Sequence, residues 1–323
     1  MNKTLCGLVC ATLMACAPLS SLAQQAWPSK TVRIVLPGPP ASSPDRITRL
    51  LAERLSKKWG QSVVVDNKPG ASTRIGGEIV ARAAPDGHTL LSTFVTHSTV
   101  KLLYPETPYD PVKDFVAITQ YATPESILAV RADSPYKTLQ ELVAGIKAAK
   151  RPLRYAHFGN GSSFHVYGLI VGRETGIEVL PVPYKGEALQ MNDLLGGHVE
   201  SSFNSVGTAL PHIRAGKVRP LGIITSERSK VLPDVPTFKE LGIKGMERGG
   251  WFGFLAPAGT PKPIVDQIQR DVKELLADPE IAKTMRDQGI EPVGSTPEEF
   301  GQTIRAEVEQ WGKLLTEFNV QAN

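Results

Sequence analysis

Cysteine is scarce in this sequence and confined to one end of it. The chain has 323 residues but three cysteines, Cys6, Cys10 and Cys16, all within the first sixteen positions. The rest of the chain therefore has no disulfide framework and no thiolate metal ligands. A chain of this length is long enough to be stabilised by its hydrophobic core alone.

Long runs of like charge are missing as well. The sequence has 36 Lys and Arg against 32 Asp and Glu, a formal net charge of +4, and no basic stretch interleaved with aromatic residues. These features exclude the usual electrostatic footprint of a nucleic-acid-binding protein. A hydrophobic content of 41% with 21% charged residues is ordinary for a globular protein.

The common catalytic and cofactor motifs are also absent. There is no P-loop, no His-Glu-x-x-His and no Gly-x-Ser-x-Gly, and the six histidines show no metal-binding spacing. The segment "GNGSSF" begins like a dinucleotide fingerprint but has Phe164 where the third glycine belongs. No metal, no cofactor and no enzymatic activity are therefore predicted. One alternative is a hydrolase in which Ser162 or Ser163 is activated by His165, although no third group orients that histidine.

The first 23 residues are typical of a secretory signal peptide. Lys3 precedes an apolar run from Leu5 to Leu19, and small residues precede an expected cleavage site after Ala23. The run is too short for a stable membrane anchor. The stretch Leu-Met-Ala-Cys that ends at Cys16 also resembles a lipoprotein cleavage box, so the alternative is a protein anchored by a lipid on Cys16.

Apolar periodicity predicts alternating strands and helices. The expected strands are 31–36, 62–66, 89–95, 153–157, 177–182, 199–203, 218–225 and 251–256. The expected helices are 45–59, 75–84, 164–174, one after residue 184, and three that begin at Pro261, Pro279 and Pro297. Strands joined by helices favour mainly parallel sheets with right-handed crossovers, so two α/β units are predicted.

The two units are expected to be discontinuous in sequence. The last elements are too few for a third domain, so the first lobe should contain residues 24–124 and 229–323, and the second lobe residues 125–228. The chain would then cross between lobes twice, at 122–125 and 225–230. Two crossings in irregular segments would form a hinge.

Two loops in matching positions suggest a shared anion site. The first loop lies within "VLPGPPASSPDRITRLL", where eight stiff or small residues separate a strand from a helix capped by Ser43. The second, Gly159 to Ser163, also follows a strand and opens a helix. Helix starts at the carboxyl ends of parallel strands bind anions through free N–H groups. Each contributes ~0.3–2 kcal/mol, whereas a micromolar ligand needs roughly −8 kcal/mol, so both loops are expected to close on one ligand.

A series of motifs in order carries a family resemblance. They include "AWPSKTVRIVLPGPP", "VVVDNKPGA", "PDGHTLL", "YDPVKDF", "VPYKGEA", "LPDVPTFKELG" and "FLAPAGTPKPIV". They resemble the periplasmic solute-binding proteins of tripartite tricarboxylate transporters, the Bordetella uptake gene family. The resemblance implies a monomeric α/β protein with the two-lobed, type II-like periplasmic binding fold and no cofactor. It also implies a periplasmic location, a small carboxylate held between the lobes, and delivery to membrane permease subunits encoded elsewhere.

The sequence departs from the family pattern in both loops of the first lobe. Ala41 and Ser42 replace two glycines of the first loop, and residues 72–74 place Ser, Thr and Arg at three usually small positions. Arg74 could pair with a carboxylate through two N–H groups, while the new hydroxyls could donate to its oxygens. The alternative is that Arg74 is a solvated residue at a helix start.

The second lobe also departs from the family pattern. Asn204 stands where relatives often carry aspartate, and the loss of that charge favours a dicarboxylate or an aromatic acid over an amino acid as the ligand. Phe94, Phe158, Phe164 and Phe203 could stack on a ring, although at least two of them are expected to serve the core.

The predicted ligand contacts gather on these loops and strand ends. Lys185 could attract an anion or be a solvated turn residue, and His97 could be structural. Presentation of the solute to a sensor domain remains an alternative to transport. The predicted contacts are Pro40, Ala41, Ser42, Ser43, Asp45, Thr73, Arg74, Phe94, Thr96, His97, Phe158, Asn160, Gly161, Ser162, Ser163, Tyr184, Lys185, Phe203 and Asn204.

Overall fold

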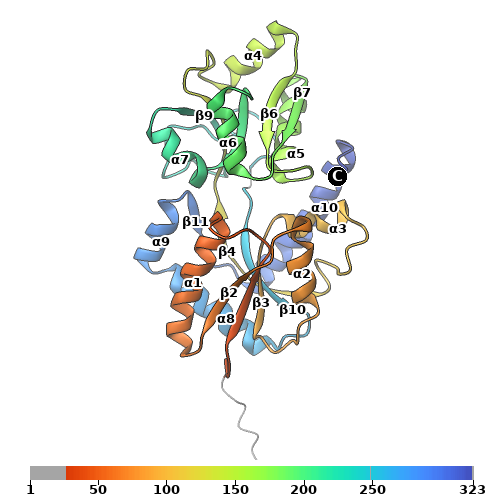
Figure 1. The fold of residues 1–323 in the computed structure, drawn as a ribbon, viewed down its shortest axis with the longest axis vertical. Helices are drawn as coiled ribbons and strands as arrows, with labels where there is room; N and C mark the ends of the chain where they lie inside the picture. Colours follow the sequence, from red (N-terminus) through yellow and green to blue (C-terminus); the bar gives the residue numbers. More distant parts are fainter. Residues whose placement is uncertain (1–26, 248, 322–323) are drawn as a thin grey trace, which may run out of the picture.

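Two mixed sheets organise the chain into two lobes (Figure 1). The structure is a computed structural model that describes residues 27–247 and 249–321. The predicted signal peptide and Cys16 lie outside the described residues. Within them, each sheet is flanked by helices, which confirms the predicted α/β class and the two-lobed architecture.

The first sheet has the strand order β11-β4-β10-β3-β1-β2. Strands β1 (Val32–Leu36), β2 (Val63–Asn67) and β3 (Thr89–Phe94) are parallel and lie within one residue of their predicted positions. Strands β10 (Phe252–Pro257), β4 (Phe115–Pro124) and β11 (Ile290–Pro292) pair with their neighbours in antiparallel fashion. Helices cover both faces, which is why β1 is a nearly continuous apolar run.

The helices of the first lobe include the five predicted ones, with small shifts, and two that were not predicted, η1 (Ala71–Thr73) and α3 (Thr96–Leu103). The predicted ones are α1 (Ser43–Trp59), α2 (Arg74–Ala81), α8 (Lys262–Leu276), α9 (Pro279–Arg286) and α10 (Pro297–Glu317). The helix cap expected at Ser43 is wrong by one residue, because Ser42 has the extended N-cap conformation and Ser43 is already helical. The Ser42 hydroxyl does not cap α1 but donates to Pro39 O at 2.7 Å.

The second sheet has the strand order β7-β6-β8-β5-β9. Its strands are β5 (Ser126–Arg131), β6 (Leu153–His157), β7 (Val179–Pro183), β8 (Ser201–Ser205) and β9 (Val218–Ile224). Its helices are α4 (Leu139–Ala149), α5 (Ser163–Thr175), α6 (Glu187–Gly196) and α7 (Val206–Arg214).

Parallel pairing makes up a smaller share of both sheets than predicted. In the second sheet β6 is parallel to β7 and β8, whereas β5 is antiparallel to β8 and β9. The reason is the path of the chain. A strand that enters a lobe from the lobe boundary, as β5 and β10 do, runs opposite to the neighbouring strands that end at that boundary.

The chain passes between the sheets twice. The first crossing is at Glu125, between β4 and β5. Residues 229–246, expected in the first lobe, pack on the second sheet instead: Phe238 N donates to Ile223 O at 3.0 Å, and its ring stacks 6.4 Å from Phe203. The return crossing therefore follows Met246, later than the predicted range 225–230, because the segment first adds a bridge between Ile223 and Thr237 to the sheet edge.

Helix α10 belongs to the first lobe by sequence but also touches the second. The ring of Trp311 lies 6.1 Å from that of Tyr167 in α5, and Arg173 of α5 pairs with Glu317 at 2.8 Å. In Figure 1 the carboxyl end of α10 accordingly lies beside α5. Across the described ranges, none of the helices combines the length and the apolar character needed to span a bilayer.

Candidate functional site

Four loops follow parallel strands at the boundary between the lobes. We call residues 38–43 and 70–74 of the first lobe, and 158–163 and 184–187 of the second, the interlobe loops. They follow β1, β2, β6 and β7, whose carboxyl ends share the boundary edge of their sheets, where ligands of α/β proteins commonly bind.

Close contacts between the lobes confirm where these loops lie. A Cβ atom added to Gly161 would be 2.5 Å from the side chain of Leu103 in α3, so the second lobe touches the first at this loop. On the other flank, a Cβ on Gly207 of α7 would be 2.8 Å from Gln288 O, and the Gln288 side chain accepts from Arg46 Nε at 3.0 Å. The loops of the two lobes therefore approach one another.

Asp45 organises the first interlobe loop from beneath. Its carboxylate is buried and accepts hydrogen bonds from Ala41 N (2.9 Å), Asn67 Nδ2 (2.9 Å) and Arg49 Nε (3.1 Å). Burial opposes ionisation, but these hydrogen bonds together outweigh it and hold the pKa of Asp45 below its usual range. Both carboxylate oxygens are thus engaged within the lobe.

The exposed part of the same loop is its tip. Pro40 and Ala41 are exposed, and Ser42 and Ser43 are half-buried. Phe94 borders the loop, since a Cβ on Gly38 would lie 3.7 Å from its ring, and Phe94 is itself half-buried. The loop thus presents small residues, hydroxyls and one aromatic ring toward the boundary.

The second interlobe loop has an unusual backbone. Ala71, Ser72 and Thr73 have φ angles of 46°, 51° and 76°, which place three consecutive non-glycine residues in the left-handed region. For a β-branched residue such as Thr73 this is a genuine outlier. Such residues cost on the order of 1–3 kcal/mol each and persist only where the surroundings enforce them. One such contact is a hydrogen bond from Ser72 Oγ to Tyr104 Oη, 3.0 Å long.

Arg74 is occupied by a partner that neither sequence interpretation foresaw. Its Nη1 pairs with Glu106 Oε1 at 2.7 Å, and its guanidinium carbon lies 5.2 Å from the centre of the Tyr104 ring. Its Nε atom is buried and has no hydrogen-bond partner among the described residues. Arg74 is therefore not simply solvated, and its contact with a ligand stays a prediction.

The loop before α5 is built around a helix cap. Ser162 is the N-cap residue, and its Oγ accepts from His165 N at 3.3 Å. His165 Nδ1 in turn accepts from Gly161 N at 3.1 Å. Ser163 is buried in the first turn, while Asn160 is half-buried in the preceding turn. These are the contacts of a capped helix rather than of a nucleophile activated by its base.

The four candidate phenylalanines divide into two pairs. Phe164 and Phe203 are 4% and 1% exposed and belong to the core, in line with the expectation that at least two would. Phe158 is half-buried, with its ring 4.6 Å from that of Phe164 in an edge-on arrangement. Phe158 and Phe94 are thus the two of these four rings that reach the surface of the lobes.

His97 has the contacts of a structural residue. It is fully buried in α3, its Nε2 lies 2.9 Å from Pro111 O, and its ring packs against Phe115 and Tyr109. Burial lowers the pKa of His97 to about 4, against the opposing effect of the Pro111 carbonyl. Thr96, at the start of α3, is half-buried.

The loop after β7 carries one engaged and one open polar residue. Tyr184 donates from its hydroxyl to Asp193 Oδ2 at 2.7 Å, and its backbone N–H bonds to His157 O at 2.9 Å. Lys185 is exposed. The tyrosine therefore braces α6 against the sheet, and the lysine is the residue of this loop that is open to a solute.

A buried polar cluster lies at the end of β8. Neither amide atom of Asn204 has a hydrogen-bond partner within the described residues, and neither has Gln190 Oε1. The Gln190 amide nitrogen bonds to Phe203 O, and Glu187 accepts from Ser205 N and Oγ at 2.8 and 2.6 Å. Buried amides without partners cost about 1–3 kcal/mol, which favours a polar occupant. The sequence interpretation included Asn204 but missed Gln190 and Glu187, whose only signal was polarity on an otherwise apolar helix face.

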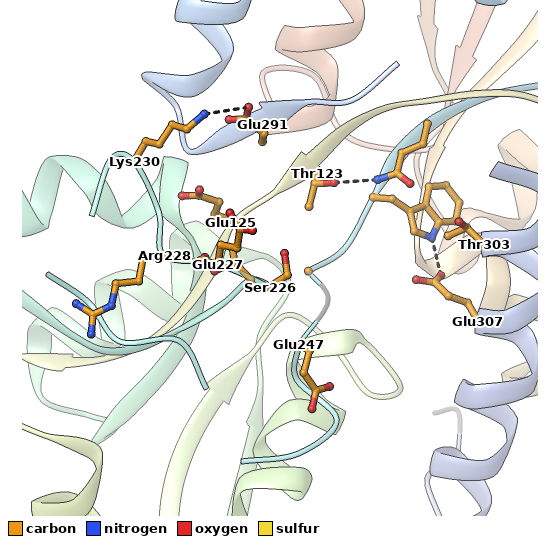
Figure 2. A pocket seen from close by; sticks show the side chains of 14 residues that line it. Thr123, Glu125, Ser226, Glu227, Arg228, Lys230, Glu247, Glu291, Thr303 and Glu307 are labelled. Atoms are coloured by element: carbon orange, nitrogen blue, oxygen red, sulfur yellow. Dashed lines mark hydrogen bonds and ion pairs between the residues drawn. The ribbon is translucent and has the colours of Figure 1, made fainter. Parts of the chain in front are cut away.

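A separate pocket of about 500 Å³ lies where the chain crosses between the lobes (Figure 2). In it Lys230 lies 3.8 Å from Glu291, and Trp251 Nε1 donates to Glu307 at 2.5 Å. None of the predicted ligand contacts lines this pocket. Its lining residues are Gln120, Thr123, Glu125, Thr225, Ser226, Glu227, Arg228, Lys230, Glu247, Gly249, Trp251, Glu291, Thr303 and Glu307.

The charges of this pocket argue against a carboxylate there. Its wall carries the carboxylates of five glutamates against the cations Arg228 and Lys230. An acid would meet like charge, so the interlobe loops are the better candidate site for an anion. Within the two described ranges, no group of three or more His, Cys, Asp and Glu side chains is arranged to hold a metal ion.

Comparison with known proteins points to one family. The model of the tripartite tricarboxylate transporter family receptor (TctC) matches residues 47–320. A UPF0065 protein from the tcbD-tcbE intergenic region of Pseudomonas sp. strain P51 is 34% identical, over 92% of this chain and 89% of that protein. Protein BugT of Bordetella pertussis is 32% identical, over 96% of this chain and 95% of its own length.

Solved structures agree with this. The chain matches Rpa4515 of R. palustris, a structure with adipate, with a TM-score of 0.83 and 32% identity, covering 92% of this chain and 100% of that one. It matches MatC of Rhodopseudomonas palustris, which has bound malate, with a TM-score of 0.78 and 31% identity, covering 90% and 100%. Both are similar over nearly their whole length.

Proposed function

This chain belongs to the tripartite tricarboxylate transporter receptor family, and from that premise we propose that it binds a small dicarboxylate or aromatic acid between its lobes. As a TctC-type protein it is a solute-binding protein with the family's two-lobed fold. The observation that carries the proposal is the approach of helix-start loops from both lobes to one boundary. The relatives solved with adipate and malate support a carboxylate as the ligand.

The loops supply the donors that a carboxylate needs. Helices α1, α5 and α6 begin at or next to interlobe loops, so their free N–H groups and positive dipole ends face the boundary. Each start contributes ~0.3–2 kcal/mol, and charge-assisted hydrogen bonds from Ser43 and Thr73 would each add ~1.5–3 kcal/mol. Together these reach the roughly −8 kcal/mol of a micromolar complex.

The polar cluster at the end of β8 favours an acid without an ammonium group. Asn204 is neutral, and the nearby Glu187 carboxylate is already engaged by Ser205. An ammonium group would therefore lack a free carboxylate partner in this cluster, whereas an amide can donate to a second carboxylate. Phe94 and Phe158, the two rings at the lobe surface, would suit the apolar middle of a dicarboxylate or an aromatic ring.

The proposal extends to location and partners. The chain would be exported with cleavage after Ala23 and act as a monomer in the periplasm. It would then deliver its solute to the permease subunits of a tripartite transporter. Deletion of those subunits should abolish uptake of the solute while leaving its binding by this protein unchanged.

Thermal unfolding of the mature chain with a panel of acids tests the proposal. The panel contains citrate, adipate, malate, aspartate, nicotinate, benzoate and benzene dicarboxylates, with adipamide as an uncharged control. A ligand at a hundred times its dissociation constant should stabilise the fold by about 2.7 kcal/mol, a shift of several degrees. A shift with diacids or aromatic acids but not with adipamide is the expected result. Protein refolded from denaturant that responds to none of the acids would contradict the proposal.

A further inference from the structure

Two stacked histidines lie directly beneath the interlobe loop that opens α5. His157 ends β6 and His165 is in the first turn of α5. Their ring centroids are 4.6 Å apart and their planes are inclined by 12°. The residues are 0% and 8% exposed. A buried parallel pair cannot accept two positive charges without strong repulsion, so the arrangement favours uncharged rings.

Both rings contact the same short turn, residues 159–161. His157 Nδ1 lies 2.9 Å from Gly159 O and 3.3 Å from Gly159 N, and His165 Nδ1 accepts from Gly161 N at 3.1 Å. The two glycines have φ angles of 133° and 71°, which side-chain-bearing residues rarely adopt. The turn is therefore held from below by two imidazoles rather than by the standard ladder of a helix or sheet.

We propose that His157 and His165 are positioning residues of the binding site: as an uncharged pair they fix the turn 159–161, and thereby the donors at the start of α5, in the orientation that receives the solute. This inference rests on the proposed function, because it takes the loop 158–163 to contact the solute. It assigns the two histidines neither a contact with the solute nor a catalytic step.

The contacts of each histidine ring indicate which of its two nitrogens carries the proton. To accept from Gly161 N–H, His165 Nδ1 must be unprotonated, so its proton is on Nε2. His157 Nδ1 can donate to Gly159 O at 2.9 Å or accept from Gly159 N at 3.3 Å, and the shorter of these two contacts favours a proton on that nitrogen. His157 Nε2 is then unprotonated, and it is buried with no hydrogen-bond partner among the described residues. The pair therefore consists of opposite tautomers, and a further proton on either ring has no prepared acceptor.

The surroundings keep the pair uncharged. Burial, followed by the neighbouring His165, lowers the pKa of His157 to about 4, against the opposing effect of Gly159 O. Burial also lowers the pKa of His165. Tyr155 of β6 is the titratable neighbour: its ring is 5.8 Å from that of His157, its hydroxyl donates to His165 O at 2.6 Å, and burial raises its pKa.

A matched pair of variants separates positioning from bulk packing. In His165→Asn the side-chain oxygen can replace Nδ1 as the acceptor for Gly161 N–H but cannot titrate, whereas His165→Leu keeps bulk and removes the acceptor. Adipate and malate binding to the full mature chain is measured by calorimetry at pH 7.5. We expect His165→Leu to weaken binding about 5- to 100-fold and His165→Asn no more than about threefold. Equal losses in both variants, or none in either, would overturn the inference.

A measurement without ligand keeps this inference distinct from the proposed function. The ring nitrogen shifts of the ligand-free protein are followed by NMR from pH 7.5 to 4, together with the amide signals of Gly159 and Gly161. We expect opposite tautomers, titration midpoints below 6.5, and a Gly161 amide signal that moves with the His165 ring. Identical tautomers, or a Gly161 signal that ignores the His165 titration, would refute the positioning role. Failure to bind any acid while these signals behave as expected would refute the proposed function instead.

Discussion

At the scale of single residues, the loop 71–73 contains three of the six described non-glycine residues that have positive φ angles. Its three non-glycine residues adopt conformations that glycine adopts without penalty. The family pattern has small residues at 72–74, so the backbone has kept a glycine-like path while the side chains changed. The change adds two hydroxyls, of which that of Ser72 donates to Tyr104, and its cost is strain.

The strain in this loop can be measured. Thr73→Gly, at φ 76°, and Ser72→Gly, at φ 51°, should each raise the free energy of unfolding by about 1 kcal/mol, since the relief of strain exceeds the entropy cost of glycine. Ser43→Gly, in the first turn of α1, is the control and should lower it by about 0.5–1 kcal/mol. Urea unfolding provides the values. Destabilisation by both loop variants would show that this backbone is unstrained.

Arg74 leads to a prediction about affinity. Glu106, which competes for its guanidinium, has a 62% exposed side chain. Such pairs are worth ~0.2–1 kcal/mol, so Glu106→Gln should tighten binding of the preferred acid about 1.5- to 5-fold by freeing Arg74. Arg74→Ala should weaken it. Titration calorimetry of both variants checks this, and an Arg74→Ala protein with wild-type affinity would remove Arg74 from the site.

At the scale of elements, prediction from sequence succeeded where strands and helices alternate. β1, β2, β3 and β6 lie within one residue of the expected ranges, because apolar period and turn residues agree there. β4 and β5 were missed although "FVAITQYATP" and "SILAVR" are apolar. They carry the chain from one lobe to the other, so β4 is followed directly by β5 and not by a crossover helix. The alternation of strand and helix that identifies a βαβ unit in a sequence is therefore missing here.

The loops that form the candidate site could be located from the sequence for the same reason. Loops after parallel strands can be located from local sequence, and the interlobe loops lie where they were expected. Side chains that come into contact only when the chain has folded cannot be located from local sequence. Glu106 is 32 residues from Arg74, and Gln190 reaches Phe203 O from another element. The stacking of His157 on His165 likewise requires the strand and helix to be packed first.

The contact between the loop 158–163 and α3 gives a prediction at this scale. Gly161→Ala would place its Cβ 2.5 Å from Leu103 and also requires a residue at φ 71°. We expect a loss of stability of about 1–3 kcal/mol from clash and strain together. Leu103→Ala, at a buried position, should cost about 2–3 kcal/mol alone but distinctly less in the Gly161→Ala background, because the clash is then relieved. Urea unfolding of the four proteins measures the coupling, and strict additivity would mean that the loop and helix do not press on each other.

At the scale of the whole molecule, buried titratable groups determine how the free energy of unfolding changes with pH. Burial holds the pKa of His97 and of His157 at about 4, below the 6.5 of an unfolded histidine. The unfolded chain therefore takes up protons first as the pH falls, so stability from these groups is full above pH 6.5 and declines toward pH 4. At pH 4.5 the loss should be roughly 2.5 kcal/mol per histidine.

One buried carboxyl group has the opposite effect on the pH dependence of stability. Burial raises the pKa of Glu125, helped by Glu291 and opposed by its hydrogen bond from Ser229. Its contribution to stability is present below the unfolded pKa and is lost as the pH rises through its folded value. Glu125→Gln should therefore gain stability at pH 7.5 relative to the wild type and lose that advantage near pH 4. Urea midpoints at pH 7.5, 5.5 and 4.5 decide both points, and a wild-type midpoint that rises steadily on acidification would contradict the histidine assignment.

Loops of both lobes are proposed to hold one and the same carboxylate. Hydrogen exchange of the backbone amides, with and without a saturating concentration of the acid that raises the unfolding temperature most, tests this proposal directly. We expect slower exchange in 38–43 and 158–163 together, since their N–H groups would be covered by the same ligand. Protection confined to one lobe, or to the acidic pocket around Glu125 and residues 225–230, would contradict it.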